Sequence, residues 1–360
     1  MGDDFVALWE KVVNVINEVA LEYDKQWQVR KRVINSMLII LLIFRLVCSK
    51  NSQSYETTID ELWDSCDRLD LPLPQNGSIA PSSFCAARLK LDENIFKEIN
   101  QKIIATYAHE DKWLGHRIFA VDGSKINLPR KLISSNYKLP SKNATYPQGL
   151  LSCLYQIKSQ MPFDFDLVSH ANERICAEHH LHTLEQNDVV IYDRGYFSYV
   201  MLHHHFDSKI HAVFRLQKNS YTVIKHIFCI EDFHAKSERG VKQEIFAHFA
   251  LITMNRIFAN KADVDLNQSN YPASDHKDYL QTHILKINFK NCIQVFSRSM
   301  EELLLLQTKI KRSVERVYKF IIGRNQKERP GRSYARKSMK PGPKWQPSKE
   351  RKKKTQILAT

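Results

Sequence analysis

Apolar residues recur at helical spacing through the first 110 residues of the chain. Three segments show this pattern, "ALWEKVVNVINEVALEY", "RKRVINSMLIILLIFRLV" and "ENIFKEINQKIIATYA", and a loop, "LPLPQNGSIAPSS", precedes the third. The longest apolar run, Met37 to Phe44, is stopped by Arg45 and is far shorter than the roughly 20 residues that a membrane span needs. We therefore expect a helical N-terminal domain over residues 1–110, with this run buried and no membrane association.

From residue 111 the pattern changes to short apolar runs bounded by Gly, Pro and polar turns. "HRIFAVDGSKINLP" and "GLLSCLYQIKSQMPFDFDLVSH" predict three strands, and "ANERICAEHHLHTLEQ" predicts a helix capped by Asn172. "NDVVIYDRGYFSYVMLHHHF" predicts a strand from Val189 to Tyr192, a turn and a helix, and "KIHAVFRLQ" adds a strand. This order predicts a mixed α/β sheet with helices packed on it, in a core over residues 111–260.

Helical spacing returns in the last third of the chain. "ERGVKQEIFAHFALITMNRIFAN" predicts one helix, and "RSMEELLLLQTKIKRSVERVYKFII" predicts a second long helix within a C-terminal helical segment over residues 261–323. Residues 324–360 are rich in Pro, Gly, Lys and Arg and cannot bury a core. We expect them to form a disordered basic tail.

Charge and cysteine content narrow the class of protein. The seven cysteines are scattered without a CxxC pair, which argues against a zinc ribbon or a disulfide frame and favours a reducing, cytoplasmic setting. The net charge is +14, and residues 324–354 carry thirteen Lys and Arg against Glu328 and Glu350, or +11 of that excess. Such a tail can neutralise DNA phosphates; the alternative is a solubilising or translation-scar tail. The candidate DNA contacts in it are Arg329, Arg332, Lys352 and Lys353.

Two aspartates carry the candidate chemistry. Asp122 follows "RIFAV" and Asp193 follows "VVIY", so each ends an apolar strand before a Gly-containing turn. The carboxyl ends of strands in open α/β sheets are where ligands collect, and two carboxylates there repel each other unless a cation lies between them. Paired hard divalent cations suit in-line phosphoryl transfer. The alternative is that "DGS" and "DRG" are ordinary turn sequences.

Other polar residues near these motifs have two interpretations. Arg194 and Lys125 could each meet a DNA phosphate or remain solvated on the surface. The histidines at 179–180 and 203–205 are consecutive rather than four apart, so they do not converge on one metal ion. Together with Glu173, we assign them to polar helix faces.

Three motifs together resemble a known family. "FAVDGSKINLP", "NDVVIYDRGYFSYVML" and "IEDFHAKSERGVKQEIFAHFALITMNRIFAN" are similar, in order, to the DDE transposases of bacterial insertion sequences, of the family four type with a Tyr-Arg-Glu-Lys signature. The similarity covers about residues 80–325. It implies a ribonuclease H-like core and a two-metal Mg²⁺ site in which Asp122 and Asp193 are ligands. It also implies cleavage and strand transfer at DNA ends.

The resemblance also implies partners and a location. The partners would be double-stranded DNA, both terminal inverted repeats and target, and either a second copy of the chain or an intact transposase. The location would be the bacterial cytoplasm, at the nucleoid. The helical N-terminal region is the natural candidate for recognising the DNA ends, although it lacks a clear helix-turn-helix signature and could be plain scaffold.

The third carboxylate of the family is not where the resemblance requires it. The signature runs Tyr, two residues, Arg, three residues, Glu, six residues, Lys. If Lys225 is its last residue, the other positions hold His211, Phe214 and Lys218, and Phe214 lies in a predicted strand. Relatives also carry a strand-rich insertion before this point, for which the chain has almost no room. The resemblance therefore implies an internal deletion that removes the insertion and the catalytic Glu.

Two other glutamates are weak candidates for the missing ligand. Glu231 follows the expected position by several helical turns, and Glu302 keeps the Arg-Glu-Lys intervals with Arg298 and Lys309 but comes after "IEDFH". Two hypotheses therefore remain. The chain is a DDE transposase that is catalytically defective, or it is a DNA-binding remnant that occupies transposon ends or inhibits an intact copy.

Overall fold

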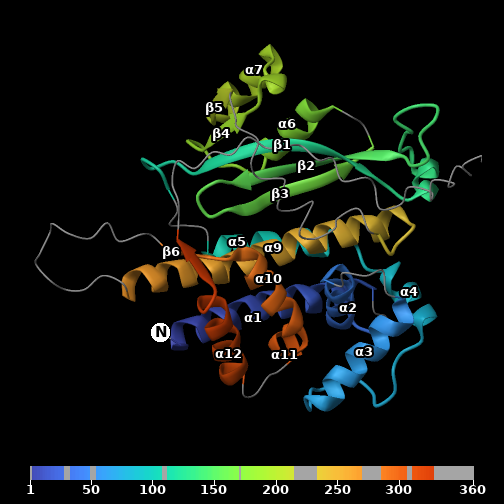
Figure 1. The fold of residues 1–360 in the computed structure, drawn as a ribbon. Coiled ribbons are helices and arrows are strands. Elements are labelled where there is room, and N and C mark those ends of the chain that lie inside the picture. The colour runs from blue at the N-terminus through green and yellow to red at the C-terminus, as the bar shows by residue number, and fades with distance from the viewer. Residues whose placement is uncertain are drawn as a thin grey trace, which may run out of the picture. The chain divides into compact units, whose positions relative to one another are not determined.

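A mixed sheet of five strands forms the framework of the fold, in the order β3-β2-β1-β4-β5 (Figure 1). The strands are β1 (Ile118–Asn127), β2 (Gln148–Gln156), β3 (Met161–Val168), β4 (Val189–Tyr192) and β5 (His211–Phe214). β1, β2 and β3 pair antiparallel, whereas β1, β4 and β5 pair parallel. The computed structural model describes residues 2–27, 33–48, 54–107, 112–169, 172–214, 233–269, 285–305 and 310–327. The predicted mixed α/β sheet is confirmed, as is the predicted order of its strands and helices along the chain.

Helices cover both faces of this sheet (Figure 1). On one face lie α6 (Glu173–Leu181), which connects β3 to β4, and α7 (Tyr199–Ser208), which connects β4 to β5. The side chain of Asn172 accepts a hydrogen bond from the Arg174 amide, so the predicted helix cap is confirmed. On the other face lie α5 (Ile95–Tyr107) and α9 (Glu238–Ser269), both of which contact β3.

The long helix α9 is buried on nearly all sides because it lies between the sheet and a further layer of helices (Figure 1). Its Phe246 and Phe249 pack on Phe165 of the sheet, and its Phe258 packs on Trp9 of α1. A helix that is apolar all round is typical of such an interior position.

The helical layer beyond α9 combines the two ends of the described chain. It contains α1 (Gly2–Trp27), α2 (Ser36–Cys48), α3 (Tyr55–Arg68), α4 (Pro81–Arg88), α10 (Phe289–Arg298), α11 (Met300–Leu305) and α12 (Ile310–Ile322). α1 packs on α12 and α5, and α2 packs on α9. β6 (Leu285–Ile287) and β7 (Asn325–Lys327) form a separate two-stranded sheet. The domain limits at 110, 260 and 323 stay predictions.

The apolar run from Met37 to Phe44 lies within α2, where Leu38 to Phe44 are buried, as expected. Among the described helices, none combines the length and the apolar character that crossing a bilayer requires.

The prediction of a second long helix near the C-terminus is wrong. α10 ends at Arg298, Ser299 lies outside it with its amide bonded to the Phe296 carbonyl, and α11 begins at Met300. Residues 306–309 are outside the described ranges, and α12 begins at Ile310. A tightened last turn with a bond back to the third preceding carbonyl is typical of a helix end. Arg298 and Glu302 therefore lie on different helices, so their spacing does not give them one common face.

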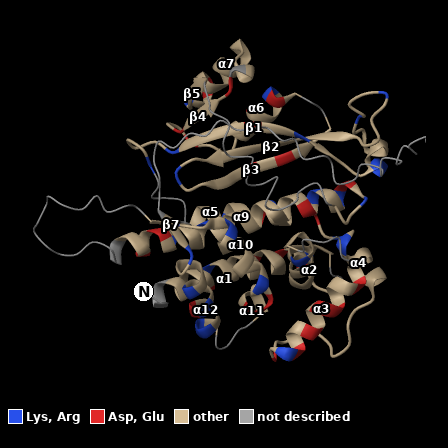
Figure 2. Ribbon diagram, viewed as in Figure 1, with Lys and Arg blue, Asp and Glu red and all other residues tan. Residues whose placement is uncertain are grey.

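Figure 2 shows both signs of charge on α3, α6 and α9, whereas the sheet carries few charged residues. The basic excess of the sequence falls in residues 324–360, nearly all of which lie outside the described ranges. The described part of the chain thus carries positive and negative side chains in nearly equal numbers.

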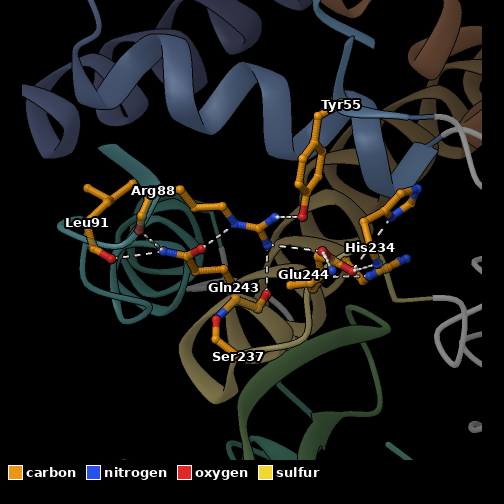
Figure 3. Close-up of polar contacts among 10 residues, drawn as sticks. Tyr55, Arg88, Leu91, His234, Ser237, Gln243 and Glu244 are labelled. Carbon is orange, nitrogen blue, oxygen red and sulfur yellow. Dashed lines mark hydrogen bonds and ion pairs between the residues drawn. The ribbon is translucent and has the colours of Figure 1, made fainter. Parts of the chain in front are cut away.

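A buried ion pair joins α4 to α9 (Figure 3). Arg88 is 5% exposed and Glu244 is 1% exposed, and Arg88 Nη2 lies 3.1 Å from Glu244 Oε1. The same guanidinium donates to Gln243 Oε1 at 2.7 Å, to the Gly240 carbonyl at 2.8 Å and to the Tyr55 hydroxyl at 3.3 Å. The charge of Arg88 is therefore fully hydrogen-bonded inside the protein, as a buried charge must be.

The carboxylate partner is equally well satisfied. Glu244 accepts hydrogen bonds from the backbone amides of His234 and Ala235, both at 2.9 Å. Burial disfavours the ionised form, but hydrogen bonding from His234 and the charge of Arg88 outweigh it and lower the pKa of Glu244. Glu244 is therefore a carboxylate that holds the segment before α9 in place.

Replacing Arg88 with Met should destabilise the fold by about 3 to 5 kcal/mol, because it leaves Glu244 as an uncompensated buried charge. Equilibrium unfolding in urea at pH 7 measures this loss. The matched control is Arg239→Gln, which breaks a half-exposed pair with Glu93 and should cost about 1 kcal/mol or less. Equal losses for the two variants would contradict the central role of the buried pair.

Candidate active site

The register of β1 and β4 relates Asp122 and Asp193. Ile118 to Ala120 of β1 pair with Val189 to Ile191 of β4, and the same offset, continued beyond the paired residues, relates Asp122 to Asp193. Neighbouring strands are about 4.8 Å apart, and residues level on adjacent strands face the same side of the sheet. Both aspartates therefore lie near the carboxyl end of β4, although Asp193 follows that strand and is not paired with β1.

The strand that carries Asp122 continues past it. The prediction that Asp122 ends a strand is wrong, because β1 runs on to Asn127 and pairs with β2 over its whole length. Pairing with β2 on one side keeps the backbone extended from Gly123 onward, so no turn forms there. β4 does end at Tyr192, and Asp193 follows it as predicted. Because β4 is short, β1 has no described strand partner on that side level with Asp122.

The turn after β4 is tied to α6. The Tyr196 amide donates to the Asp193 carbonyl at 3.1 Å and closes a short 3₁₀ turn over Arg194–Tyr196. Arg174, in the first turn of α6, donates from Nε to the Gly195 carbonyl at 2.9 Å. Helix α6 therefore fixes the backbone that carries Asp193, whose own side chain is exposed.

The side chain of Tyr196 places its hydroxyl group among the apolar residues that pack below the turn after β4. Its side chain is 2% exposed and packs on Tyr192 with ring centroids 5.5 Å apart. Among the described residues no acceptor meets the hydroxyl in good hydrogen-bond geometry, although Glu173 lies near enough to act on it as an acceptor. Burial, with smaller contributions from the charges of Glu173 and Asp122, raises the pKa of the Tyr196 hydroxyl far above its ordinary value. The hydroxyl is therefore neutral and close to two acidic side chains.

Glu173 lies directly over the strand residue that follows Asp122. A Cβ atom on Gly123 would come within 2.9 Å of Glu173 Cγ and 3.1 Å of its Cδ. The sequence interpretation assigned Glu173 to a polar helix face and missed this contact. The signal that could have found it is the cap at Asn172, which starts α6 at Glu173 and so turns this side chain toward the strand ends.

A Ser-His-Asp chain fastens the other end of α6 to the sheet. Ser152 Oγ lies 3.0 Å from His180 Nε2, and His180 Nδ1 lies 2.7 Å from Asp164 Oδ2. Burial opposes ionisation of Asp164, but the hydrogen bond from His180 and the charge of Lys97 lower its pKa. The order resembles a hydrolytic relay, yet Ser152 is 0% exposed, so no substrate could reach it. The two hydrogen bonds of Ser152, His180 and Asp164 therefore have a structural role, which is to hold α6 on the sheet.

The three consecutive histidines of α7 have three different partners. His203 pairs with Asp207, His204 with Glu178, and His205 Nε2 with the Tyr192 hydroxyl at 2.9 Å. They do not converge, as the sequence predicts.

The remaining predicted site residues are dispersed or outside the described ranges. Lys125 is exposed on β1, three residues beyond Asp122, and strand alternation puts it on the opposite face. Arg194 follows Asp193 directly, but its side chain is not described. Glu302 lies on α11 in the helical layer, paired with Arg316. Those outside the described ranges are Lys225, Glu231, Arg329, Arg332, Lys352 and Lys353.

The signature positions after β4 lie on a strand. The prediction that Phe214 belongs to a strand is confirmed, since β5 spans His211–Phe214. Lys218 is outside the described residues. An extended segment cannot present residues three and four apart on one face as a helix does.

A mixed sheet of this order, with helices on both faces, defines a ribonuclease H-like α/β fold.

Residues 113–223 match the family model described as the transposase DDE domain. The match covers less than half of the chain. The matched segment contains the whole five-stranded sheet and both aspartates. No curated protein matches the chain. The DDE domain indicates a transposase function, with DNA as partner.

Transposase DDE domains generally use divalent metal ions. The carboxylate oxygens of Asp122 and Asp193 are donors that hard cations prefer. Among the described residues, however, no three His, Cys, Asp or Glu side chains surround one point. The assignment of both aspartates as metal ligands therefore stays a prediction.

Tyr196→Phe should leave the free energy of unfolding unchanged or raise it by about 1 kcal/mol, because no described acceptor meets the buried hydroxyl in good hydrogen-bond geometry. Tyr318→Phe is the control, since that hydroxyl donates to Asp265, and its loss should cost about 1 to 3 kcal/mol. Urea unfolding of both variants tests this. A loss in Tyr196→Phe as large as in Tyr318→Phe would show that the Tyr196 hydroxyl has a partner in solution.

Proposed function

We propose that this chain is a DDE transposase of the insertion-sequence type that keeps two of its three catalytic carboxylates and is catalytically defective. The observation that supports the proposal is the register of β1 and β4 within the segment that matches the DDE domain, because its offset, continued past the paired residues, relates Asp122 to Asp193. The motif "IEDFHAKSERGVKQEIFAHF" further supports the family four type with a Tyr-Arg-Glu-Lys signature.

The chemistry expected of this site is phosphoryl transfer in DNA. A divalent cation, Mg²⁺ by preference, would polarise the scissile phosphate and the attacking oxygen when held by Asp122 and Asp193. The protein's own contribution would be to hold the two carboxylates near each other at the carboxyl end of β4. Two cavities of about 660 Å³ lie elsewhere, one of them lined by residues of α1, α2 and α11.

The expected defect follows from the missing Glu. His211 and Phe214 lie on a strand where the signature helix is required, and Glu302 is paired with Arg316 in another layer. Each metal or electrostatic contribution supplies several kcal/mol of transition-state stabilisation, so loss of one ligand should nearly abolish strand transfer.

The second candidate function is DNA binding without cleavage. The basic excess in residues 324–354, thirteen Lys and Arg against two Glu, favours it because counterion release needs charge rather than a fold. Such a chain would occupy terminal inverted repeats, or pair with an intact transposase and inhibit it.

Incubation with terminal-repeat DNA and Mg²⁺ or Mn²⁺ should give binding but little or no nicking and joining. Asp122→Asn and Asp193→Asn should bind DNA with unchanged affinity, because these carboxylates do not contribute to counterion release. Gel shift and denaturing electrophoresis of end-labelled DNA measure both properties.

Robust joining that disappears in Asp193→Ala but survives Glu231→Ala and Glu302→Ala would contradict the proposed defect. Robust joining that disappears in Glu231→Ala would instead identify the missing ligand.

Neutralising four tail residues, Arg329, Arg332, Lys352 and Lys353, to Gln should flatten the slope of log affinity against log salt by about 3 to 4, at about 0.9 per lost phosphate contact. The control replaces four exposed basic residues of the helical layer, Lys11, Lys25, Arg312 and Lys319, with Gln. Fluorescence anisotropy over a salt series measures both slopes. A larger effect in the control would assign DNA binding to the helical layer instead of the tail.

A further inference from the structure

The connection between β1 and β2 is much longer than a pair of antiparallel strands requires. β1 ends at Asn127 and β2 begins at Gln148, so residues 128–147, here called the β1–β2 loop, join two strands that pair along their whole length. Hairpin connections mostly have about two to five residues, and those longer than about 15 residues are mostly functional or disordered. The length of this loop therefore calls for a role beyond joining the strands.

Backbone hydrogen bonds hold the β1–β2 loop in a defined conformation. The Leu128 amide donates to the Pro147 carbonyl at 2.8 Å, and the Gln148 amide donates to the Lys138 carbonyl at 2.9 Å. Between these two bonds the chain forms a short 3₁₀ helix, η1 (Arg130–Ser135). The loop is thus an ordered part of the fold.

Buried side chains anchor the same loop on the core of the protein. Leu128, Leu132 and Tyr137 are each no more than 2% exposed. The Tyr137 hydroxyl also donates to Glu238 Oε1 of α9 at 3.3 Å. Because folding already fixes the backbone, groups on the loop would bind a partner without a further ordering cost for that backbone.

Every charged side chain of the β1–β2 loop is basic. Residues 123–163 contain no Asp or Glu, and four basic residues of the loop are exposed: Arg130, Lys131, Lys138 and Lys142. Figure 2 accordingly shows blue and no red along this connection, at the right of the sheet. None of the four is ion-paired with a residue in the described ranges.

The acidic side chains close to the loop are paired with basic groups elsewhere. Burial is the main cause of the raised pKa of Tyr137, and three nearby carboxylates raise it further: Glu238, Asp166 and Glu93. Each of them lies 3.1 to 3.8 Å from a basic nitrogen outside the loop, on Lys242, Lys97 and Arg239 in that order. The positive charge of the loop is therefore not offset by these neighbours.

The loop continues the strand that carries Asp122. Asn127 is five residues beyond Asp122, so at about 3.3 Å per residue the loop begins about 17 Å from it. Successive base pairs of a duplex are about 3.4 Å apart, so this distance corresponds to about five base pairs. A duplex that meets Asp122 and lies along β1 would bring its phosphates to the loop.

We propose that the β1–β2 loop is a contact surface for the phosphate backbone of double-stranded DNA, formed by Arg130, Lys131, Lys138 and Lys142. The inference rests on the proposed function, since the DNA that meets the aspartates is the DNA that the loop holds. It adds a folded contact site to the basic residues 324–354. Phosphate contacts position a duplex without reading its sequence, so the loop acts on terminal-repeat and unrelated duplexes alike.

Fluorescence anisotropy of a short labelled duplex of unrelated sequence, over a salt series with the full-length protein, tests the proposal. Changing all four loop residues to Gln should flatten the slope of log affinity against log salt by about 3 to 4, at about 0.9 per lost phosphate contact. The control makes the same change in charge on the helical layer and should leave the slope as it is in the unmodified protein: Lys11, Lys25, Arg312 and Lys319 to Gln.

Photo-crosslinking gives a second readout that needs only one substitution. Lys138→p-benzoylphenylalanine should crosslink to the labelled duplex on irradiation, because Lys138 is exposed on the proposed surface. Lys319→p-benzoylphenylalanine, on α12, is the control and should not crosslink. Circular dichroism verifies that each variant is folded, and the crosslink keeps the test decisive if the fourfold variant is not.

The outcomes separate this inference from the proposed function. An unchanged salt slope in the loop variant, with no crosslink at position 138, would overturn the loop contact and leave the two-aspartate site standing. Polyglutamate that displaces the duplex from the loop at equal charge concentration would also overturn it, because the loop would then be a site for acidic peptides. Robust joining of terminal-repeat DNA would contradict the proposed defect and leave the loop contact standing.

Discussion

The fold depends on the burial of α9 between the sheet and the helical layer. Most of such a helix is turned away from water, so its buried polar side chains must find partners inside the protein. Glu244 forms an ion pair with Arg88, and Gln243 accepts a hydrogen bond from it. Thr253 donates a hydrogen bond to Asn100 at 2.5 Å, and Asp265 accepts one from Tyr318. These partners come from α4, α5 and α12, which lie far apart in the sequence. The polar groups of α9 thus determine which helices pack around it. Its apolar groups contribute most of the favourable free energy of folding, because they are removed from water.

The same arrangement puts α9 and α5 at a distance from β4. Both helices contact β3, on the side of the sheet away from β4 and β5. β4 and β5 have four residues each, whereas β1 has ten. Asp122 therefore lies on the part of β1 that extends past its pairing with β4, and the exposed Asp193 directly follows the end of β4. A side chain carried by a strand or by its end has a backbone position that the sheet sets, as catalytic positioning requires.

Local patterns in the sequence were sufficient for the succession of strands and helices along the chain, the cap at Asn172 and the position of Asp193 after β4, because each depends on residues close in the chain. The strand after Asp122 could not be predicted in this way. "DGS" favours a turn locally, and only pairing with β2, some thirty residues away, keeps it extended. The break at Ser299 had the same cause, since "RSMEELLLL" has continuous helical spacing and only tertiary contacts such as the Trp9 hydrogen bond to the Leu303 carbonyl fix where the helices end. Glu173 was missed because its neighbour in space is Gly123, fifty residues earlier.

Electrostatics sets what two aspartates can do near the end of a strand. Carboxylates held near each other repel, and in water they reduce that cost by turning apart or by binding a cation. The backbone of Asp122 is held by the pairing of β1 with β2, and the turn after Asp193 is bonded to Arg174 of α6. If the two side chains approach each other, as the proposed function requires, a divalent cation between them would offset their repulsion.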